Sequence, residues 1–185
     1  SSGLSEACNA ASLASQEEEF KNKVFVVDNG GVAFLNKVPM YVARRMIDQG
    51  KTASEIKEYL ESVKNDAVAY IAVDTLKYLK KGGRITPAAA AIGTLLSIKP
   101  ILRVAGGGGK LDAAAKVISF KLAKSKIISI VKKLIEENYA EEYKNGQVII
   151  CVTHSMPDLE NAELKDFVTL VKQEFADAPF FSLDP

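Results

Sequence analysis

The chain has 185 residues, of which 48% are hydrophobic, and its formal net charge at pH 7 is +1. This is enough apolar sequence for one generous domain or two small ones. The two cysteines, Cys8 and Cys151, lie far apart and form no CxxC motif, which argues against a disulfide framework and against a zinc site. No apolar run approaches the ~20 residues of a membrane span, and the first residues lack the features of a signal peptide. A cytoplasmic location is therefore expected.

The charges are distributed unevenly along the chain. Residues 77–133 contain thirteen Lys or Arg but a single acid, Asp112, whereas the segments on either side are acidic overall. Such a basic block favours anionic partners, such as phosphates, an acidic protein face or an anionic membrane surface. Its only aromatic residues are Tyr78 and Phe120, which argues against nucleic acid bound by base stacking.

The N-terminal sequence SSGLSEACNA predicts a loop followed by a helix. Ser5 is the expected N-cap, with Glu6 favourable at the positive end of the helix. The loop before the helix could present the hydroxyls of Ser1 or Ser2 and backbone N–H groups to a carboxylate or phosphate. A capped helix without any ligand remains the alternative.

Residues 23–66 read as a strand followed by two helices. The run at 23–28 is almost continuously apolar and stops at Asn29-Gly30-Gly31, which predicts a strand covered on both faces, as in a parallel sheet. A helix is expected over 38–49. A second helix is expected after Thr52, because Thr52 and Glu55 have the spacing of a capping box.

Residues 74–100 contain more helix-capping and turn signals than any other stretch of the chain. After an expected strand at 67–73, Asp74 is the expected cap of a short helix that ends in a left-handed turn at Gly82-Gly83. Thr86-Pro87 predicts the start of an alanine-rich helix. Arg84 is therefore expected on a tight connector between two helix ends, either as the cation of a site for an anionic head and apolar tail or simply as a cap for carbonyls.

The second half of the chain predicts a hairpin with a glycine turn at 106–109, a helix over 120–137, a strand at 147–153 and a last helix over 164–175. Residues 179–185 contain no expected element. The glycine turn has neither GxGxxG spacing nor a GK[ST] ending, so a nucleotide loop is not favoured. His154 follows a strand end, where open α/β sheets place ligand groups, but it has no nucleophile or metal-ligand cluster beside it. No self-contained catalytic apparatus is visible.

Taken together, these motifs resemble the DegV family, the bacterial fatty-acid-binding proteins called FakB when they serve a fatty acid kinase. SSGLSEACNAA is similar to the family's SSGLSGTYQSA segment, and VFVVDNGG to its strand ending in VDS. LKYLKKGGRIT and LLSIKPIL are similar to its signatures LxYLKKGGRI and LLxIKPIL. The resemblance covers nearly the whole chain.

The resemblance implies an α/β fold of two domains with a long-chain fatty acid buried between them. Residues 1–66 would be a remnant of the first domain, and residues 67–185 a second α/β domain with a β-hairpin. The chain would be a lipid carrier, without cofactor, metal or enzymatic activity, which presents the acyl carboxylate to a separate fatty acid kinase that supplies ATP and metal. The implied ligand-binding residues are Ser1, Ser2, Gly3, Ser5, Arg84, Ile85 and Ile98, with Ser2 as the main hydroxyl, and the implied docking residues are Lys116, Lys121 and Lys124.

The sequence also departs from the family pattern. The family's TSQPS loop has no counterpart before Ser1 and its HTGPG loop has none after Pro185, so the chain is expected to be truncated at both ends. Lys116-Val117-Ile118 stands where the family usually has KVR. Two other functions stay open: a phosphotransfer enzyme that holds a nucleotide with the glycine turn and the basic block, and a module that docks on an acidic protein or transiently on an anionic membrane surface.

Overall fold

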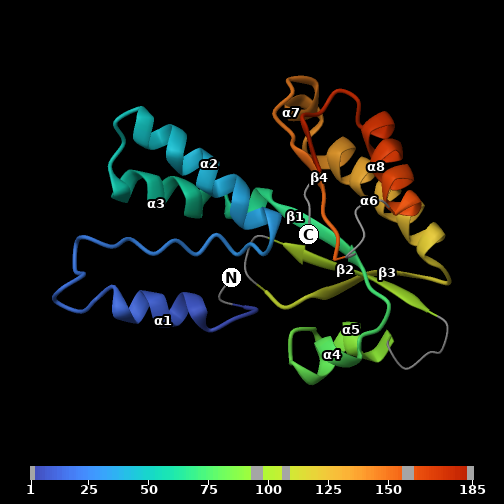
Figure 1. Cartoon of the computed structure of the whole chain (residues 1–185), viewed down its shortest axis with the longest axis horizontal. Helices are drawn as coiled ribbons and strands as arrows, with labels where there is room; N and C mark the ends of the chain where they lie inside the picture. The colour runs from blue at the N-terminus through green and yellow to red at the C-terminus, as the bar shows by residue number, and fades with distance from the viewer. Residues whose placement is uncertain (1–2, 93–97, 106–108, 156–160, 183–185) are drawn as a thin grey trace. The chain divides into compact units, whose positions relative to one another are not determined.

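The computed structural model describes residues 3–92, 98–105, 109–155 and 161–182 (Figure 1). The chain divides into two compact units, Ser1–Ile118 and Ser119–Pro185, and each is described here by itself. Both units mix helices with a small sheet, so the predicted α/β class with a β-hairpin is confirmed. These two units do not test the domain boundary expected after residue 66, which stays a prediction.

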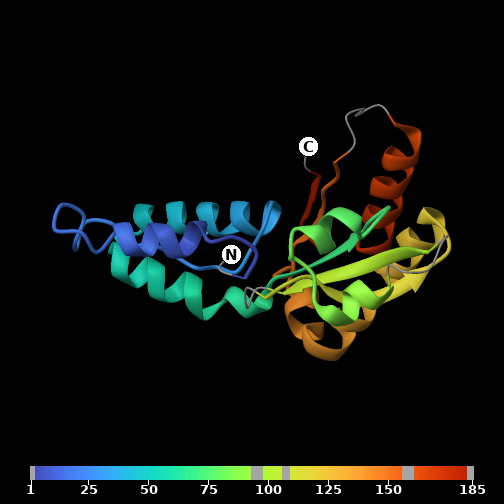
Figure 2. The same cartoon turned by 90° about the horizontal axis from the view of Figure 1, so that it is seen from below.

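The first unit begins with three helices, α1 (Ala7–Ala14), α2 (Phe34–Asp48) and α3 (Ala53–Ser62), followed by the short 3₁₀ helix η1 (Lys64–Asp66). Helices α2 and α3 pack side by side (Figure 2). The predicted capping box is confirmed: the Glu55 amide donates to the Thr52 hydroxyl at 3.3 Å, and the Thr52 amide donates to the Glu55 carboxylate at 2.8 Å. None of the residues of α2 is buried, and its Met40 is 70% exposed.

The strand predicted at residues 23–28 is not formed. The segment is irregular in the structure, and no ladder partner lies beside it among the residues described. Side chains of α3 bond to its backbone instead, because Lys57 donates to the carbonyl of Val26 at 2.5 Å and the Asp28 amide donates to Glu61 at 3.2 Å. An apolar run becomes a strand only where another strand satisfies its backbone groups.

The sheet of the first unit has three strands, β1 (Val68–Ala72), β2 (Lys99–Ala105) and β3 (Asp112–Val117), in the order β1-β2-β3. Both pairings are antiparallel, with Ile71 opposite Leu102 and Leu102 opposite Ala113. The predicted strand at 67–73 and the predicted hairpin are therefore confirmed. The parallel arrangement expected for the first half of the chain does not occur in this sheet.

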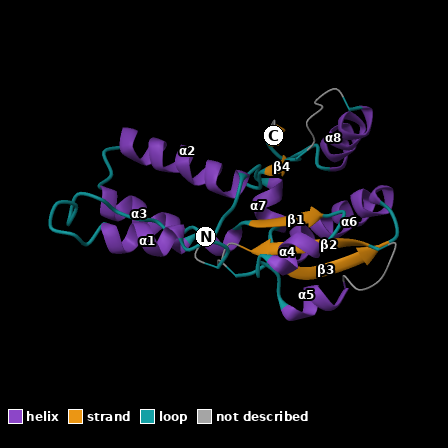
Figure 3. Ribbon diagram, turned by 60° about the horizontal axis from the view of Figure 1, so that its bottom comes forward, coloured by secondary structure: helices purple, strands orange, loops and turns teal. Residues whose placement is uncertain are grey.

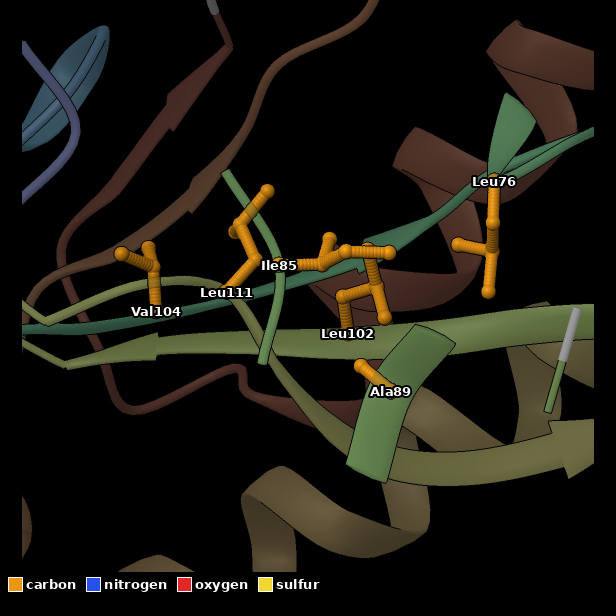
Figure 4. Packing of buried hydrophobic residues seen from close by; sticks show 6 residues of the cluster. All are labelled: Leu76, Ile85, Ala89, Leu102, Val104 and Leu111. Atoms are coloured by element: carbon orange, nitrogen blue, oxygen red, sulfur yellow. The ribbon is translucent and has the colours of Figure 1, made fainter. Parts of the chain in front are cut away.

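Two short helices, α4 (Lys77–Lys81) and α5 (Pro87–Ile92), cover one face of this sheet (Figures 1 and 3). Ala89 of α5 is fully buried, and its small side chain lets the helix approach the strands closely. Figure 4 shows the core between the helices and the sheet, which consists of Leu76, Ile85, Ala89, Leu102, Val104 and Leu111.

The second unit contains α6 (Phe120–Asn138), α7 (Ala140–Lys144), β4 (Ile150–Val152), α8 (Ala162–Glu174) and β5 (Phe180–Ser182). Helices α6 and α8 pack together, with Ile128, Ile135, Val152, Val171 and Phe175 as the buried core. Strand β4 is shorter than predicted and pairs in parallel with β5. The expectation that residues 179–185 contain no element was therefore wrong, because three of them pair with β4. Among the helices that the structure describes, none has the length and apolar character needed to cross a bilayer.

The capping box gives a pH-dependent contribution to stability. Hydrogen bonds from the Thr52 amide and then from Lys51 lower the pKa of Glu55 from 4.5 to about 2. Because the folded pKa lies below the unfolded one, the stabilisation is present above pH 4.5 and is lost as the pH falls towards 2. We expect Glu55→Gln to reduce the loss of melting temperature over this acid range. An identical acid profile in wild type and variant would contradict this.

The core of the first unit should be sensitive to truncation at Leu102, which is fully buried. Leu102→Ala is expected to lower the free energy of unfolding by about 2–5 kcal/mol, through lost burial and a residual cavity. Leu13→Ala is the matched control, because Leu13 is 75% exposed. Denaturant unfolding would measure both, and equal effects would contradict the assignment of this core.

Candidate functional site

Arg84 lies on a short connector whose backbone is fixed on both sides. Its amide donates to the carbonyl of Leu79 at 3.1 Å, and its carbonyl accepts from the Leu111 amide at 2.9 Å. The Thr86 amide donates in turn to the carbonyl of Leu111 at 2.9 Å. These last two bonds form an isolated parallel bridge between Ile85 and Leu111, just before β3. The Arg84 side chain is exposed, but its backbone has little freedom.

The two glycines before Arg84 have different physical roles. Gly83 has a φ of +68°, which confirms the predicted left-handed turn at this position. Gly82 has a right-handed helical backbone, so its conformation does not require glycine. A Cβ at Gly82 would instead lie 2.6 Å from Nη1 of Arg84, which donates to the Gly82 carbonyl at 2.8 Å. Gly82 therefore leaves room for the guanidinium. The guanidinium caps a carbonyl, which is the purely structural role that the sequence also allowed for Arg84.

Thr86 joins the connector to both α5 and β3. Its hydroxyl accepts from the Ala89 amide at 3.2 Å, which confirms the predicted N-cap, and donates to the carboxylate of Asp112 at 2.6 Å. The Thr86 hydroxyl and then the Ala113 amide hold the pKa of Asp112 below its usual range. Asp112 was not among the residues predicted for the site, since contact between residues 86 and 112 follows only from the bridge between Ile85 and Leu111.

Asp74 does not cap α4 as expected. The N-cap position is Leu76, and the hydroxyl of Thr75 accepts from the Lys77 amide at 3.2 Å. The carboxylate of Asp74 forms an ion pair with Lys99 at the start of β2. This pair joins the two ends of the segment that carries α4, the Arg84 connector and α5.

The predicted ligand-binding residues are only partly described. Ser1 and Ser2 lie outside the described residues, as do residues 93–97. Gly3 is half-buried, and Ser5 is exposed and accepts from the Ala7 amide at 3.2 Å, while Glu6 rather than Ser5 is the N-cap of α1. Between them, Leu4 packs against the core cluster that contains Ile85. Leu4 and the GGRI connector, far apart in sequence, therefore share one apolar cluster.

The side chains of Ile85 and Ile98 lie in different environments. Ile85 is 6% exposed and packs into the core opposite the exposed Arg84, whereas Ile98 is half-buried just before β2. The ligand roles assigned to these residues stay predictions. Sequence reasoning missed Leu4, which alternates with polar neighbours in too short a segment to show a periodicity.

The predicted docking lysines divide between the two units. Lys116 is exposed on β3 of the first unit, and Lys121 is exposed on α6 of the second. Lys124 is half-buried and donates to the backbone carbonyl of Glu163 on α8 at 3.0 Å. Its Nζ also lies 3.3 Å from the Glu163 carboxylate and 6.0 Å from the centre of the Phe167 ring. Lys124 therefore already contributes to the packing of the second unit.

Neither the groove of the second unit nor the single histidine forms a site of suitable chemistry among the residues described. A groove of about 660 Å³ between α6 and α8 is lined mostly by charged side chains, including Lys132, Glu136 and Glu174, which do not suit an acyl chain. His154 is half-buried beyond the end of β4. Within the described ranges, no group of three His, Cys, Asp or Glu side chains could hold a metal ion.

Comparison with known proteins gives a family match over almost the entire chain. The model described as "Uncharacterised protein, DegV family" matches residues 1–184. A DegV domain-containing protein of Clostridium perfringens is 34% identical over 158 residues, which are 84% of this chain and 52% of that protein. One of Clostridium acetobutylicum is 32% identical over 169 residues, 91% of this chain and 57% of the relative. The chain thus spans about half the length of the curated relatives it matches.

Solved structures match the fold over nearly all of the chain. DegV of Bacillus subtilis, described as a fatty acid binding protein, has a TM-score of 0.72 at 26% identity, covering 98% of this chain and 60% of that one. A DegV family protein of Thermus thermophilus, described by its fatty acid binding, has a TM-score of 0.67 at 25% identity, covering 97% and 60%. A stearic acid-binding protein of Eubacterium ventriosum has a TM-score of 0.79 at 22% identity, covering 97% and 58%, and supports the fold alone.

The role of Gly82 can be tested by a double-mutant cycle. Gly82→Ala should displace the Arg84 guanidinium and lower the free energy of unfolding by about 1 kcal/mol, roughly the value of one hydrogen bond. In an Arg84→Ala background the same change should cost nothing, because alanine fits the helical backbone at this position. Chemical denaturation measures all four proteins. An equal cost in both backgrounds would show that the space at Gly82 does not serve Arg84.

Proposed function

Because the chain belongs to the DegV family, we propose that it binds a long-chain fatty acid and presents the acyl carboxylate to a separate fatty acid kinase. The observation that carries this proposal is the match of fold and sequence to the B. subtilis and T. thermophilus proteins, both described as fatty acid binding. The shared cluster of Leu4 and Ile85 agrees with it, because it joins the two motifs on which the ligand site is proposed.

In this proposal the acyl chain is held by apolar burial and the carboxylate by hydrogen bonds. Burial of the acyl chain contributes roughly 0.8 kcal/mol per methylene, so an apolar slot supplies most of the affinity. The carboxylate needs a few oriented donors, which we assign to the loop of Ser1, Ser2, Gly3 and Ser5. Ile85 and Ile98 would contribute apolar surface, although Ile85 has only its small exposed fraction to offer.

Arg84 is assigned to the mouth of the site rather than to its interior. Its side chain is exposed while its backbone is fixed, which suits a cation that meets an anionic head group or the partner that phosphorylates it. The protein would act as a carrier without catalysis of its own, and the kinase would supply ATP and metal. Lys116 and Lys121 are proposed as docking cations. Lys124 is a weaker candidate, because α8 already engages it. A transient contact with an anionic membrane surface would allow the ligand to be exchanged. We also propose that the protein is cytoplasmic and that it does not bind nucleic acid.

Thermal shift with two ligands distinguishes a carrier from a nucleotide-binding enzyme. The full-length protein, as its gene encodes it, is used. Its free energy of unfolding should rise by about 2.7 kcal/mol when palmitate is present at 100 times its dissociation constant. ATP with magnesium should leave the melting temperature unchanged. A shift with ATP and none with palmitate would overturn the proposal in favour of a phosphotransfer enzyme.

The same assay locates the carboxylate. Ser2→Ala should weaken palmitate binding about tenfold, the effect of losing one hydrogen bond to a charged group. Ser62→Ala is the control, because the Ser62 hydroxyl bonds only to the Tyr59 carbonyl on α3 among the contacts described. Equal affinities for all three proteins would remove Ser2 from the site while leaving fatty acid binding itself intact.

A further inference from the structure

Helix α4 exposes an aromatic ring that its packing does not require. Leu76 and Leu79 point into the core, whereas Lys77, Tyr78, Lys80 and Lys81 are exposed. Tyr78 is 72% exposed, and its described ring contact is with Lys77, whose Nζ lies 5.7 Å from the ring centre. Exposed tyrosine flanked by basic side chains is a combination common at the centre of protein interfaces.

The guanidinium of Arg84 lies on the same face of α4 as Tyr78. Residues 78 and 82 are one helical turn apart and therefore stack on one face, and the Gly82 amide donates to the Tyr78 carbonyl at 2.9 Å. Arg84 fills the space that a side chain at Gly82 would occupy, with Cδ only 3.1 Å from that Cβ position. Tyr78 and Arg84 are thus neighbours although the turn separates them in sequence.

The bridge between Ile85 and Leu111 adds Lys110 to this surface. In a parallel pairing, the residues that precede and follow the bridged pair point to the face opposite to that of the bridged pair. Ile85 and Leu111 are both buried, so Arg84 and Lys110 lie together on the exposed side. Thr86 and Asp112, the residues that follow the bridged pair, lie on that side too and are hydrogen-bonded to each other. We call the residues Lys77, Tyr78, Lys81, Arg84 and Lys110 the Tyr78 surface.

Two acids lie next to the Tyr78 surface, and within the described part of the chain only one of them is paired with a cation. Asp74 pairs with Lys99, and Asp112 accepts hydrogen bonds from Thr86 and Ala113. Among the residues described, no carboxylate forms an ion pair with a cation of the Tyr78 surface. The surface therefore carries a net positive charge around one aromatic ring, because its four cations outnumber the neighbouring Asp112 carboxylate.

We propose that the Tyr78 surface is an interaction site for an acidic face of a protein partner, with Tyr78 as its central anchor. The inference rests on the proposed function, in which that partner is the fatty acid kinase. Tyr and Arg, with Trp, are the side chains enriched among residues that dominate binding energy at protein interfaces. A bilayer surface fits less well, because stable interfacial binding needs a broad apolar face and this surface offers a single ring.

The test uses the protein from its natural reading frame, loaded with palmitate, as the varied substrate of the ATP-dependent fatty acid kinase encoded in the same genome. Tyr78→Ala is expected to raise the KM for the carrier at least tenfold and to leave kcat at saturation unchanged. Tyr78→Phe should retain most of the affinity, and Arg84→Gln and Lys110→Gln should each raise KM and flatten its salt dependence. Tyr41→Ala is the matched control, because Tyr41 is another exposed tyrosine, on α2, at 61% against 72% for Tyr78.

Palmitate affinity is measured on every variant, so that the two hypotheses fail separately. Normal palmitate binding with an unchanged KM for Tyr78→Ala would overturn the Tyr78 surface and leave the carrier function intact. Unchanged KM with weakened binding to vesicles containing phosphatidylglycerol would assign the surface to lipid instead. A wild-type protein that binds no palmitate, or that the kinase does not use, would overturn the proposed function and the inference with it.

Discussion

The structure of the first unit depends on a very short pairing, the bridge between Ile85 and Leu111. Two backbone hydrogen bonds connect the segment before α5 to the segment before β3, and they bring two core side chains into contact. The Thr86–Asp112 hydrogen bond lies beside the bridge and the Asp74–Lys99 ion pair closes the segment at its base. The bridge, the Thr86–Asp112 hydrogen bond and the burial of Ala89 together fix α5 and the Arg84 connector over the sheet.

The GGRIT sequence shows how structural and functional demands coexist in five residues. Gly83 provides a left-handed backbone, Gly82 provides space, Ile85 fills the core and Thr86 caps a helix. Among these five residues, only Arg84 has an exposed side chain that can meet a ligand or partner. The hydrogen bonds of the connector fix the Arg84 backbone. Substitutions at the other four positions will therefore change stability and the placement of Arg84 together, so a measured loss of binding needs a stability measurement beside it.

The sequence predicted many of the elements that depend on local signals. The Thr52–Glu55 capping box, the Thr86 cap and the antiparallel β2–β3 pairing are formed, whereas the caps expected at Ser5 and Asp74 are not. It failed at residues 23–28 and at the end of the chain, where strand formation depends on a distant partner. In the candidate site, Arg84 was found from its motif. Asp112 and Lys110 were missed as partners of the connector, because their proximity follows from strand register.

The core of the first unit has a further consequence for folding. All six buried residues of its cluster, from Leu76 to Leu111, lie within one continuous segment, and the three paired strands follow one another along the chain. Only the β2–β3 pairing closes a short loop, which costs little chain entropy, whereas β1 pairs with β2 across 29 to 37 residues of sequence. We expect the β2–β3 hairpin to form first, and β1, α4 and α5 to pack against it afterwards.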